Sequence, residues 1–255
     1  MIIDTHAHLY FDRFDEDRDA VIRRASESGV KKIINIAVDL DSARSCVRLA
    51  EEYDGLYAAV GIHPNDAQLF DDETRDELKS LTEHPKVVAI GEIGMDYYWD
   101  KTPPALQEMV FRKQIQLAKD VGLPIIIHNR NAARDILNVL KSEGVEGLTG
   151  VFHCFSEDAV FANDVLALGF HVSFTGNLTF KNSTLPAVAK VIPLQRLLLE
   201  TDCPFLSPEP RRGRRNEPAH VIHIAKKLAE IKGLTPGEIC DETTVNAVKL
   251  FGLEG

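Results

Sequence analysis

The sequence lacks any apolar run of the roughly 18 or more residues that would span a membrane. Its first residues, MIIDTHAHLYF, also lack the basic and apolar regions of a secretory signal. Nothing in the sequence therefore supports export or membrane insertion. We expect a cytoplasmic protein that makes no membrane contact.

Cysteine is scarce and never arranged as a metal or disulfide motif. The chain has 4 cysteines, and none has CxxC spacing. This pattern favours reduced thiols over a disulfide framework or a structural zinc knuckle. The opening motif DTHAHLYF contains no glycine, which argues against the glycine-rich phosphate loop that often follows the first strand of a doubly wound sheet.

Basic residues are outnumbered, with 29 Lys and Arg against 39 Asp and Glu, a net charge of −10. An acidic chain is unsuited to coating duplex DNA or an anionic membrane through its overall field, although a local basic site remains possible. Hydrophobic residues at 44% and charged residues at 27% are typical of a globular protein.

Short β-branched runs alternate with longer segments of helical periodicity along the whole chain. Such alternation, at steps near the ~30-residue βαβ unit, favours a single (β/α)₈ TIM barrel over residues 1–255, since about 250 residues is typical of that fold. An open doubly wound sheet is the rival. The predicted strands are MIID at the start and the segments at 31–38, 55–61, 86–94, 123–128, 148–155, 169–174 and 196–202. The clearest predicted helices are 15–28, 42–53, 104–121 and 131–143.

Six potential metal ligands fall at the ends of predicted strands. His6 and His8 are two residues apart on one strand and so share a face. Alone, this HxH pair is equally consistent with polar side chains that cap the end of a barrel. The carboxyl ends of all barrel strands meet at one rim, however, and four more ligands follow later strands: Glu92, His128, His153 and Asp202.

Nitrogen and carboxylate ligands suit Zn²⁺, Mn²⁺ or Mg²⁺. Six ligands exceed what one catalytic zinc takes, so the sequence predicts two divalent metal ions with a carboxylate bridging them. Coordination of this kind lowers the pKa of water and supplies a nucleophile near neutral pH.

The motifs that carry these ligands resemble those of the TatD-related metal-dependent hydrolases, within the wider amidohydrolase-like superfamily. The resemblance runs from the first strand to the last helix, and it implies a (β/α)₈ barrel that hydrolyses phosphodiesters with divalent metals, typically as a deoxyribonuclease. The matching motifs are DTHAHL at 4–9, GIHPND at 61–66, GEIGMDYY at 91–98, HNR at 128–130, FHCFS at 152–156, ETDCPFL at 200–206 and RGRRNEP at 212–218.

The resemblance also implies a role for each ligand. It places His6, His8 and Asp202 on one ion, His128 and His153 on the other, and Glu92 between them. Asp202 is further implied to orient or deprotonate the attacking water. GEIGMD carries no lysine for a carbamate bridge, which by family analogy favours phosphate esters over C–N bonds.

Several further residues are candidate substrate contacts. His63 is predicted to meet a phosphate or a bound water, with loop capping as the alternative. Four arginines, at 211, 212, 214 and 215, lie in the loop after the last strand, and guanidinium groups bind phosphate bidentately. The resemblance points to Arg212 and Asn216; a solvated loop is the alternative.

The loop after Glu92 carries Tyr97, Tyr98 and Trp99. These rings are equally consistent with stacking on a single-stranded base and with covering the barrel mouth.

We therefore expect a two-metal hydrolase of nucleic-acid phosphodiesters, a deoxyribonuclease acting like an exonuclease on single strands or ends. The alternative keeps the metals but changes the substrate to a small cyclic amide, lactone or phosphate ester. A noncatalytic metal-dependent scaffold is the least favoured hypothesis. No stable protein partner is predicted.

Overall fold

The structure, a computed structural model, describes residues 1–253 of the chain. In this range eight parallel strands are hydrogen-bonded side by side in chain order. This arrangement confirms the predicted (β/α)₈ barrel; the predicted 1–255 domain extends two residues beyond the described range. The strands are β1 (Ile2–Ala7), β2 (Val30–Ile36), β3 (Leu56–Val60), β4 (Val87–Asp96), β5 (Ile125–Arg130), β6 (Gly150–Phe152), β7 (His171–Phe174) and β8 (Leu197–Leu199).

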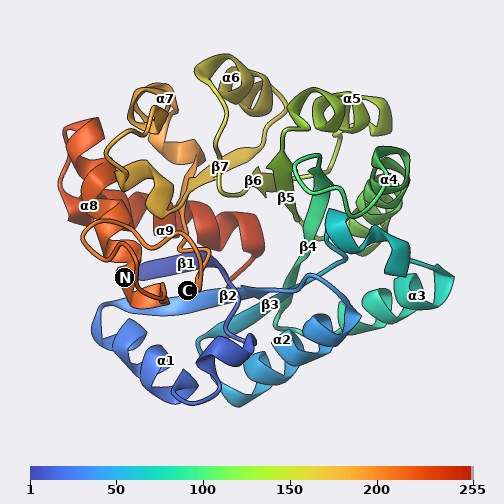
Figure 1. The fold of residues 1–255 in the computed structure, drawn as a ribbon, viewed down its shortest axis with the longest axis horizontal. Coiled ribbons are helices and arrows are strands. Elements are labelled where there is room, and N and C mark those ends of the chain that lie inside the picture. The colour runs from blue at the N-terminus through green and yellow to red at the C-terminus, as the bar shows by residue number, and fades with distance from the viewer. Residues whose placement is uncertain (254–255) are drawn as a thin grey trace.

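The helices α1 to α8 are placed around the strands in chain order (Figure 1). None of the helices within residues 1–253 is both long enough and apolar enough to cross a membrane. The α-helices are α1 (Arg18–Glu27), α2 (Leu40–Glu52), α3 (Asp72–Leu81), α4 (Pro104–Val121), α5 (Ala133–Glu143), α6 (Ala159–Ala167), α7 (Leu185–Val191), α8 (Val221–Lys232) and α9 (Pro236–Phe251). The short 3-10 helices are η1 (Asp12–Phe14), η2 (Pro64–Leu69), η3 (Gly176–Thr179), η4 (Leu194–Arg196) and η5 (Pro218–His220).

The barrel closes where β1 meets the segment that follows β8. Asp202 N–H donates to His6 O at 2.8 Å, and His8 N–H donates to Cys203 O at 2.9 Å. Deeper in the barrel, the Thr201 amide and hydroxyl both donate to the Asp4 carboxylate, at 2.9 and 2.6 Å. These bonds satisfy backbone groups that the end of β8 would otherwise leave unpaired. They also bring residues 6, 8 and 202 together.

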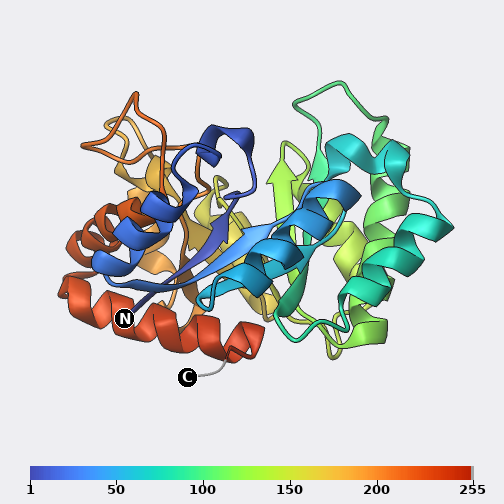
Figure 2. The same cartoon turned by 90° about the horizontal axis from the view of Figure 1, so that it is seen from below.

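One end of the barrel is sealed by α9. Its Ala247, Leu250 and Phe251 pack against inward-facing strand residues such as Ile34 and Ile126. Figure 2 shows α9 lying across this end, near both termini. A capping box between Thr235 and Glu238 starts the helix by satisfying its free backbone N–H groups. The apolar seal therefore leaves only the opposite rim for chemistry.

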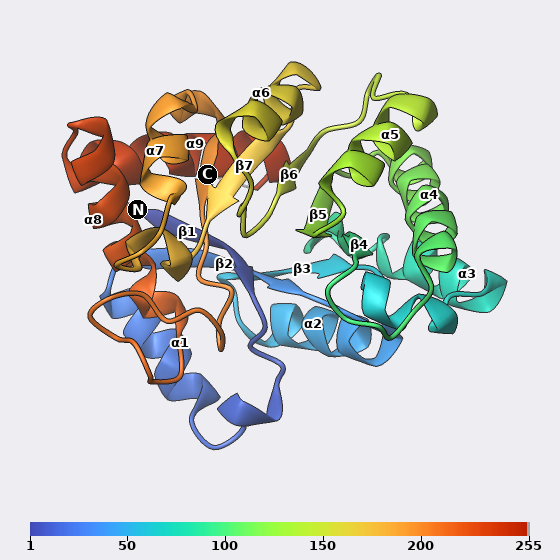
Figure 3. The ribbon, with the colours of Figure 1, turned by 45° about the horizontal axis from the view of Figure 1, so that its top comes forward.

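The opposite end carries the long loops. The loop 97–103 after β4, the segment around η1 and the loop 200–217 after β8 all rise from that rim in Figure 2. In Figure 3 the green loop 97–103 and the orange loop 200–217 lie on opposite sides of the segment that follows β1. The carboxyl ends of the strands meet between them, as in barrel enzymes generally.

The fourth strand is longer than predicted. We expected a strand over residues 86–94, with Glu92 near its end, but β4 continues to Asp96. The pairing with β5 is irregular between Ile90 and Ile93, and the Glu92 N–H donates to Ala37 O at 3.0 Å. Glu92 therefore projects from an interrupted ladder inside the strand, and the strand resumes beyond it. The 4 cysteines are free thiols, as the sequence predicted.

Gly94 is the tightest point of this irregular strand. A Cβ there would lie 2.1 Å from the backbone oxygen of His128, and Gly94 has φ +142°. A side chain at this position would have to displace β5 at a candidate ligand. Gly237, in the first turn of α9, offers a matched control because its nearest neighbour to an added Cβ is Thr235 Oγ1 at 3.8 Å.

We therefore predict that Gly94→Ala lowers the free energy of unfolding by at least about 2 kcal/mol, through backbone strain and a steric clash. Gly237→Ala should change it by less than about 1 kcal/mol, and in the stabilising direction. Urea denaturation followed by circular dichroism measures both. Equal stability of the two variants would contradict the proposed packing at Gly94.

Candidate metal centre

The first group of candidate ligands gathers at the closure of the barrel. His6 Nε2 and His8 Nε2 lie 3.2 Å apart. Asp202 Oδ1 is 3.7 Å from the first nitrogen and 3.4 Å from the second. All three ligand atoms thus converge, and both rings are buried. Because β1 and the post-β8 segment are hydrogen-bonded here, residues 196 positions apart face one point.

The second group lies across β4 and comes from β5 and the end of β6. His128 Nδ1 is 2.6 Å from Glu92 Oε1, and His153 Nε2 is 2.7 Å from the same oxygen. The two imidazole nitrogens are 3.4 Å apart. This group is therefore built around a single carboxylate oxygen.

Glu92 connects the two groups because its oxygens face different sides. Oε1 meets His128 and His153, whereas Oε2 lies 3.5 Å from His6 Nε2 and 4.0 Å from His8 Nε2. A carboxylate placed in this way can bridge two cations.

The two groups form one contiguous cluster. The His6 ring stacks on His153 with centroids 4.0 Å apart and planes 10° from parallel. Within residues 1–253, three sets of ligand atoms converge to within 4.8 Å of one another: His6 with His153 and Asp202, His6 with His8 and Glu92, and His63 with Glu92 and His128. The last set adds His63 to the possible ligands by distance, although the sequence suggested a substrate contact.

Hydrogen bonds on the outer side of the rings decide which nitrogens face the centre. His8 Nδ1 lies 2.8 Å from Ile36 O, and because a carbonyl only accepts, this nitrogen carries the proton. The lone pair of neutral His8 is then on Nε2, which points into the cluster. Such outer contacts fix the tautomer of metal-binding histidines.

Two buried carboxylates outside the predicted set act on the other rings. Asp96 Oδ2 is 3.0 Å from His128 Nε2, which leaves Nδ1 for the centre. Glu200 Oε1 lies 3.5 Å from His153 Nδ1 and accepts the Cys154 N–H at 2.6 Å. Sequence reasoning missed both residues. The available signal was their spacing, because residues an even number of positions apart in a strand share a face. Asp96 is four residues from Glu92, and Glu200 is two residues from Asp202.

The electrostatics of the cluster favour a bound cation. Burial alone would raise the pKa of Glu92, but the neighbouring His153 and hydrogen bonds from the histidines hold it well below its usual range. Burial lowers the pKa of His153, yet Glu92 and Glu200 outweigh it and raise the pKa well above its ordinary value. The carboxylates of Glu92 and Glu200 thus favour protons on the neighbouring His153 ring. A divalent cation would displace those protons.

Asp202 is held in an uncommon backbone conformation. Its φ is +56°, in the left-handed region of the backbone that residues other than glycine rarely adopt. This conformation costs roughly 1–3 kcal/mol. The N–H bond to His6 O fixes this geometry. Burial would raise the Asp202 pKa, but His8 and His6 outweigh it and keep the carboxylate ionised.

His63 sits at the edge of the cluster after β3. Its Nδ1 accepts the Asn65 N–H at 3.1 Å, so neutral His63 carries its proton on Nε2. That nitrogen lies 3.8 Å from Glu92 Oε1. Burial and the nearby His128 lower the pKa of His63 to about 3, which keeps the ring neutral. His63 thus presents an N–H donor toward the centre.

Two arginines of the loop after β8, Arg212 and Arg215, already make contacts within the protein. Arg212 is exposed, with its guanidinium carbon 3.8 Å from the Phe180 ring centroid. Arg215 pairs with both oxygens of Asp17, at 2.8 and 2.7 Å. Asp17 therefore neutralises part of the positive charge of the arginines that the sequence predicted to bind phosphate.

Asn216, predicted to bind substrate, is 0% exposed. Its amide nitrogen donates to Thr201 O and Phe205 O, at 2.9 and 2.7 Å, and its oxygen accepts the Glu217 N–H. No donor is left for a ligand. Through these hydrogen bonds, Asn216 holds the loop against the segment that follows β8.

Aromatic residues lie on two sides of the rim. Phe11 and Phe205 meet edge to face beside His8, with centroids 5.8 Å apart. Tyr98 and Trp99 form a second pair at 4.9 Å in the loop after β4. Tyr97 is separate from that pair, since its hydroxyl donates to Asp135 of α5 at 2.9 Å.

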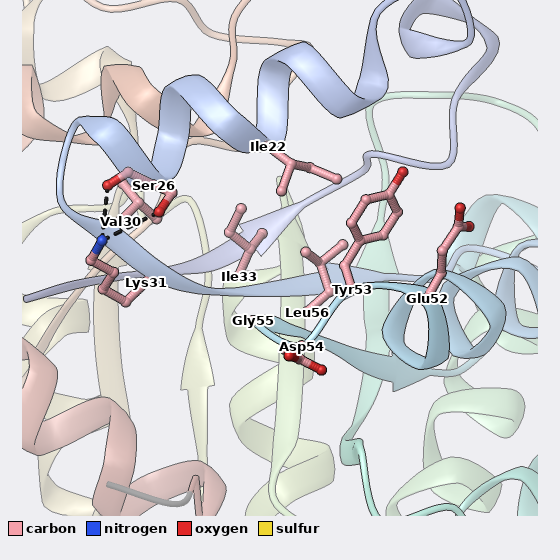
Figure 4. Close-up of a pocket in the computed structure, with 10 residues that line it drawn as sticks. All are labelled: Ile22, Ser26, Val30, Lys31, Ile33, Glu52, Tyr53, Asp54, Gly55 and Leu56. Carbon is pink, nitrogen blue, oxygen red and sulfur yellow. Dashed lines mark hydrogen bonds between the residues drawn. The ribbon is translucent and has the colours of Figure 1, made fainter.

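A separate pocket lies between α1 and the segment joining α2 to β3 (Figure 4). It shares no residue with the metal cluster. Lys31 Nζ crosses part of it to donate to Ser26 O at 3.1 Å. Its lining combines apolar side chains such as Ile22 and Leu56 with Glu52 and Tyr53. Its lining residues bring together no set of metal ligands or nucleophiles.

Comparison with known proteins agrees with this geometry. The family model described as TatD related DNase matches residues 3–252. The metal-dependent hydrolase YabD of Bacillus subtilis is 48% identical over 98% of this chain and 99% of its own. The 3'-5' ssDNA/RNA exonuclease TatD of Cronobacter sakazakii is 35% identical over 98% and 97%. The crystal structure of the TatD homologue YJJV from Escherichia coli superimposes with a TM-score of 0.94 at 32% identity, covering 99% and 98%.

The family match spans nearly the whole chain, and relatives at this identity cover it end to end. The resemblance noted in the sequence motifs is thereby confirmed. The chain belongs to the TatD-related DNase family, a family of metal-dependent hydrolases.

Proposed function

We propose that this protein hydrolyses phosphodiester bonds of single-stranded nucleic acid with two divalent cations. The observation that carries the proposal is the placement of Glu92, whose two oxygens face two separate groups of imidazoles. The name of the Cronobacter relative, an exonuclease on single-stranded DNA and RNA, supports the choice of substrate.

The donor set fits two cations of the Mg²⁺, Mn²⁺ or Zn²⁺ type. His6, His8 and Asp202 would hold one ion, His128 and His153 the other, and Glu92 both. Every ligand is an imidazole nitrogen or a carboxylate oxygen, which these metals accept. The buried His6 Nδ1 has no hydrogen-bond partner among the described residues, so His6 is directed into the site by packing rather than by an outer acceptor.

Two bound cations would lower the pKa of a water molecule and neutralise charge on the phosphate. Asp202 would take the proton of that water, because its side chain is the more exposed of the two carboxylates in the cluster, at 14% against 5% for Glu92. Glu92, enclosed by imidazoles, would serve as the bridge.

His63 and Arg212 would bind the substrate phosphate. His63 presents its Nε2–H toward the centre and stays neutral, which suits donation to a phosphoryl oxygen rather than metal ligation. Arg212 is exposed on the loop that follows Asp202 and forms no ion pair within residues 1–253, in contrast to Arg215. Its guanidinium, which lies over the Phe180 ring and donates to Ser207 O at 3.4 Å, would meet a phosphate beyond the reacting one.

The first prediction concerns metal removal. Chelation should abolish hydrolysis of a single-stranded oligonucleotide, and Mg²⁺ or Mn²⁺ should restore it, because the bound cations would lower the pKa of the water that Asp202 deprotonates. Gel analysis of labelled oligonucleotide measures the activity, with circular dichroism as a control for folding. Full activity in rigorously metal-free protein would overturn the two-metal mechanism. Faster turnover of a lactone, cyclic amide or small phosphate ester would favour the alternative substrate class.

The second prediction separates the bridge from a terminal ligand. Glu92→Gln should reduce the bound metal from two ions toward none, because both groups lose the same carboxylate. His153→Gln should lose chiefly one ion, since its nitrogen faces only one side of Glu92. Metal analysis of the purified variants gives the stoichiometry. An equal loss of one ion in each variant would argue against bridging.

The third prediction concerns the proposed base. Asp202→Asn keeps the size of the side chain but removes its charge, so kcat should fall by at least about 100-fold, as is typical when a general base is lost. The KM for oligonucleotide should change much less. Steady-state kinetics at saturating metal provides the test, with metal content measured in parallel. Near-native kcat with both ions bound would reassign Asp202 to a structural role.

A further inference from the structure

Two large aromatic side chains remain exposed at the rim beside the second ligand group. Tyr98 is 54% exposed and Trp99 48%. Their rings meet at 90°, so Tyr98 and Trp99 do not cover each other face to face. Folded proteins normally bury rings of this size, and adjacent exposed rings beside a reaction centre indicate a binding surface.

An arginine completes this surface. The Arg130 guanidinium carbon lies 3.7 Å from the Tyr98 ring centroid and 5.6 Å from that of Trp99. Within residues 1–253, Arg130 forms no ion pair with a carboxylate, whereas Arg112 pairs with Glu108 and Glu143, and Arg215 pairs with Asp17. Its charge is therefore available to an anionic ligand, which favours a nucleic acid over an apolar protein partner.

The backbone fixes this surface relative to the metal centre. Asp96 Oδ1 accepts the N–H groups of Tyr98 and Trp99, at 2.9 and 3.2 Å, while its Oδ2 lies 3.0 Å from His128 Nε2. Tyr97 N–H donates to Arg130 O at 2.8 Å, which extends the β4–β5 pairing. One carboxylate thus holds both the aromatic loop and a candidate ligand, so the rings have a fixed position beside the candidate metal centre.

We propose that Trp99, Tyr98 and Arg130 form a subsite that stacks one base of a single-stranded nucleic acid next to the reacting phosphate. This inference rests on the proposed function and adds a binding residue set to it. The indole stacks on the base, and the guanidinium held on Tyr98 meets the adjoining phosphate. Every base has a π-face, so the subsite recognises a base without selecting its identity.

Trp99 is the only tryptophan of the chain, so its fluorescence reports on this subsite alone. The titration uses the metal-loaded protein carrying Asp202→Asn, which slows cleavage of the oligonucleotide during the measurement. The probes are oligothymidylate and an abasic phosphodiester of equal length and charge, and anisotropy of labelled probe measures binding independently. Stacking predicts quenching by oligothymidylate at saturation and none by the abasic strand.

Variants in the active protein give the energetic test. Trp99→Ala should raise the KM for oligonucleotide at least about fivefold, the lower bound expected for one stacked base, with little change in kcat. Trp99→Phe retains a ring and should recover most of the loss. Met109→Ala, in α4 and 45% exposed, removes an apolar side chain of similar exposure elsewhere and should leave KM unchanged.

Oligonucleotide binding without selective quenching, or an unchanged KM in Trp99→Ala, would overturn the subsite while leaving the nuclease function standing. Failure of the wild-type protein to bind or cleave any oligonucleotide would instead overturn the proposed function, and the subsite with it.

Discussion

The closure between β1 and the segment after β8 is the contact on which the rest of the site depends. Two backbone hydrogen bonds, from Asp202 to His6 and from His8 to Cys203, join the two ends of the sheet. Side chains alternate in direction along an extended segment, so His6 and His8, two residues apart, point toward the same side of it. The hydrogen bonds bring Asp202 to that side as well. The same bonds that remove the open edges of the sheet thereby assemble half of the candidate metal centre.

The second half depends on Glu92, whose position follows from an interruption inside β4. Where the ladder to β5 breaks, the Glu92 amide bonds across to Ala37, and the strand resumes at Ile93. The side chain is thus enclosed by histidines from both sides, and these histidines hold the pKa of Glu92 well below its usual range although the group is buried. Buried charges of this kind are tolerable only when paired, so the cluster is suited to exchanging protons for cations.

The apolar packing and the candidate metal ligands lie at opposite ends of the barrel. At one end, α9 seals an apolar interior with Leu250 and Phe251. At the other, the buried groups are polar, and left-handed backbone at Cys154 and Asp202 places strain beside the ligands. Strain of this size persists only where surrounding bonds over-determine the geometry. At Cys154 that support includes Glu200, which accepts its amide, and at Asp202 it is the bond to His6.

The sequence alone determined the barrel, because β-branched runs alternate with helical segments at βαβ spacing. It also determined the six candidate ligands, because the two-residue spacing of His6 and His8 and the recurrence of such residues at strand ends are local patterns that a parallel barrel brings to one rim. Only the tertiary structure decided which nitrogen of each ring faces the centre, since the deciding partners, Ile36 for His8 and Asp96 for His128, are 28 and 32 residues away. It also buried Asn216 and paired Arg215 with Asp17, 198 residues distant. Hydrogen bonds between elements far apart in the chain leave no periodic signal in the sequence, so these assignments depend on how the loops pack.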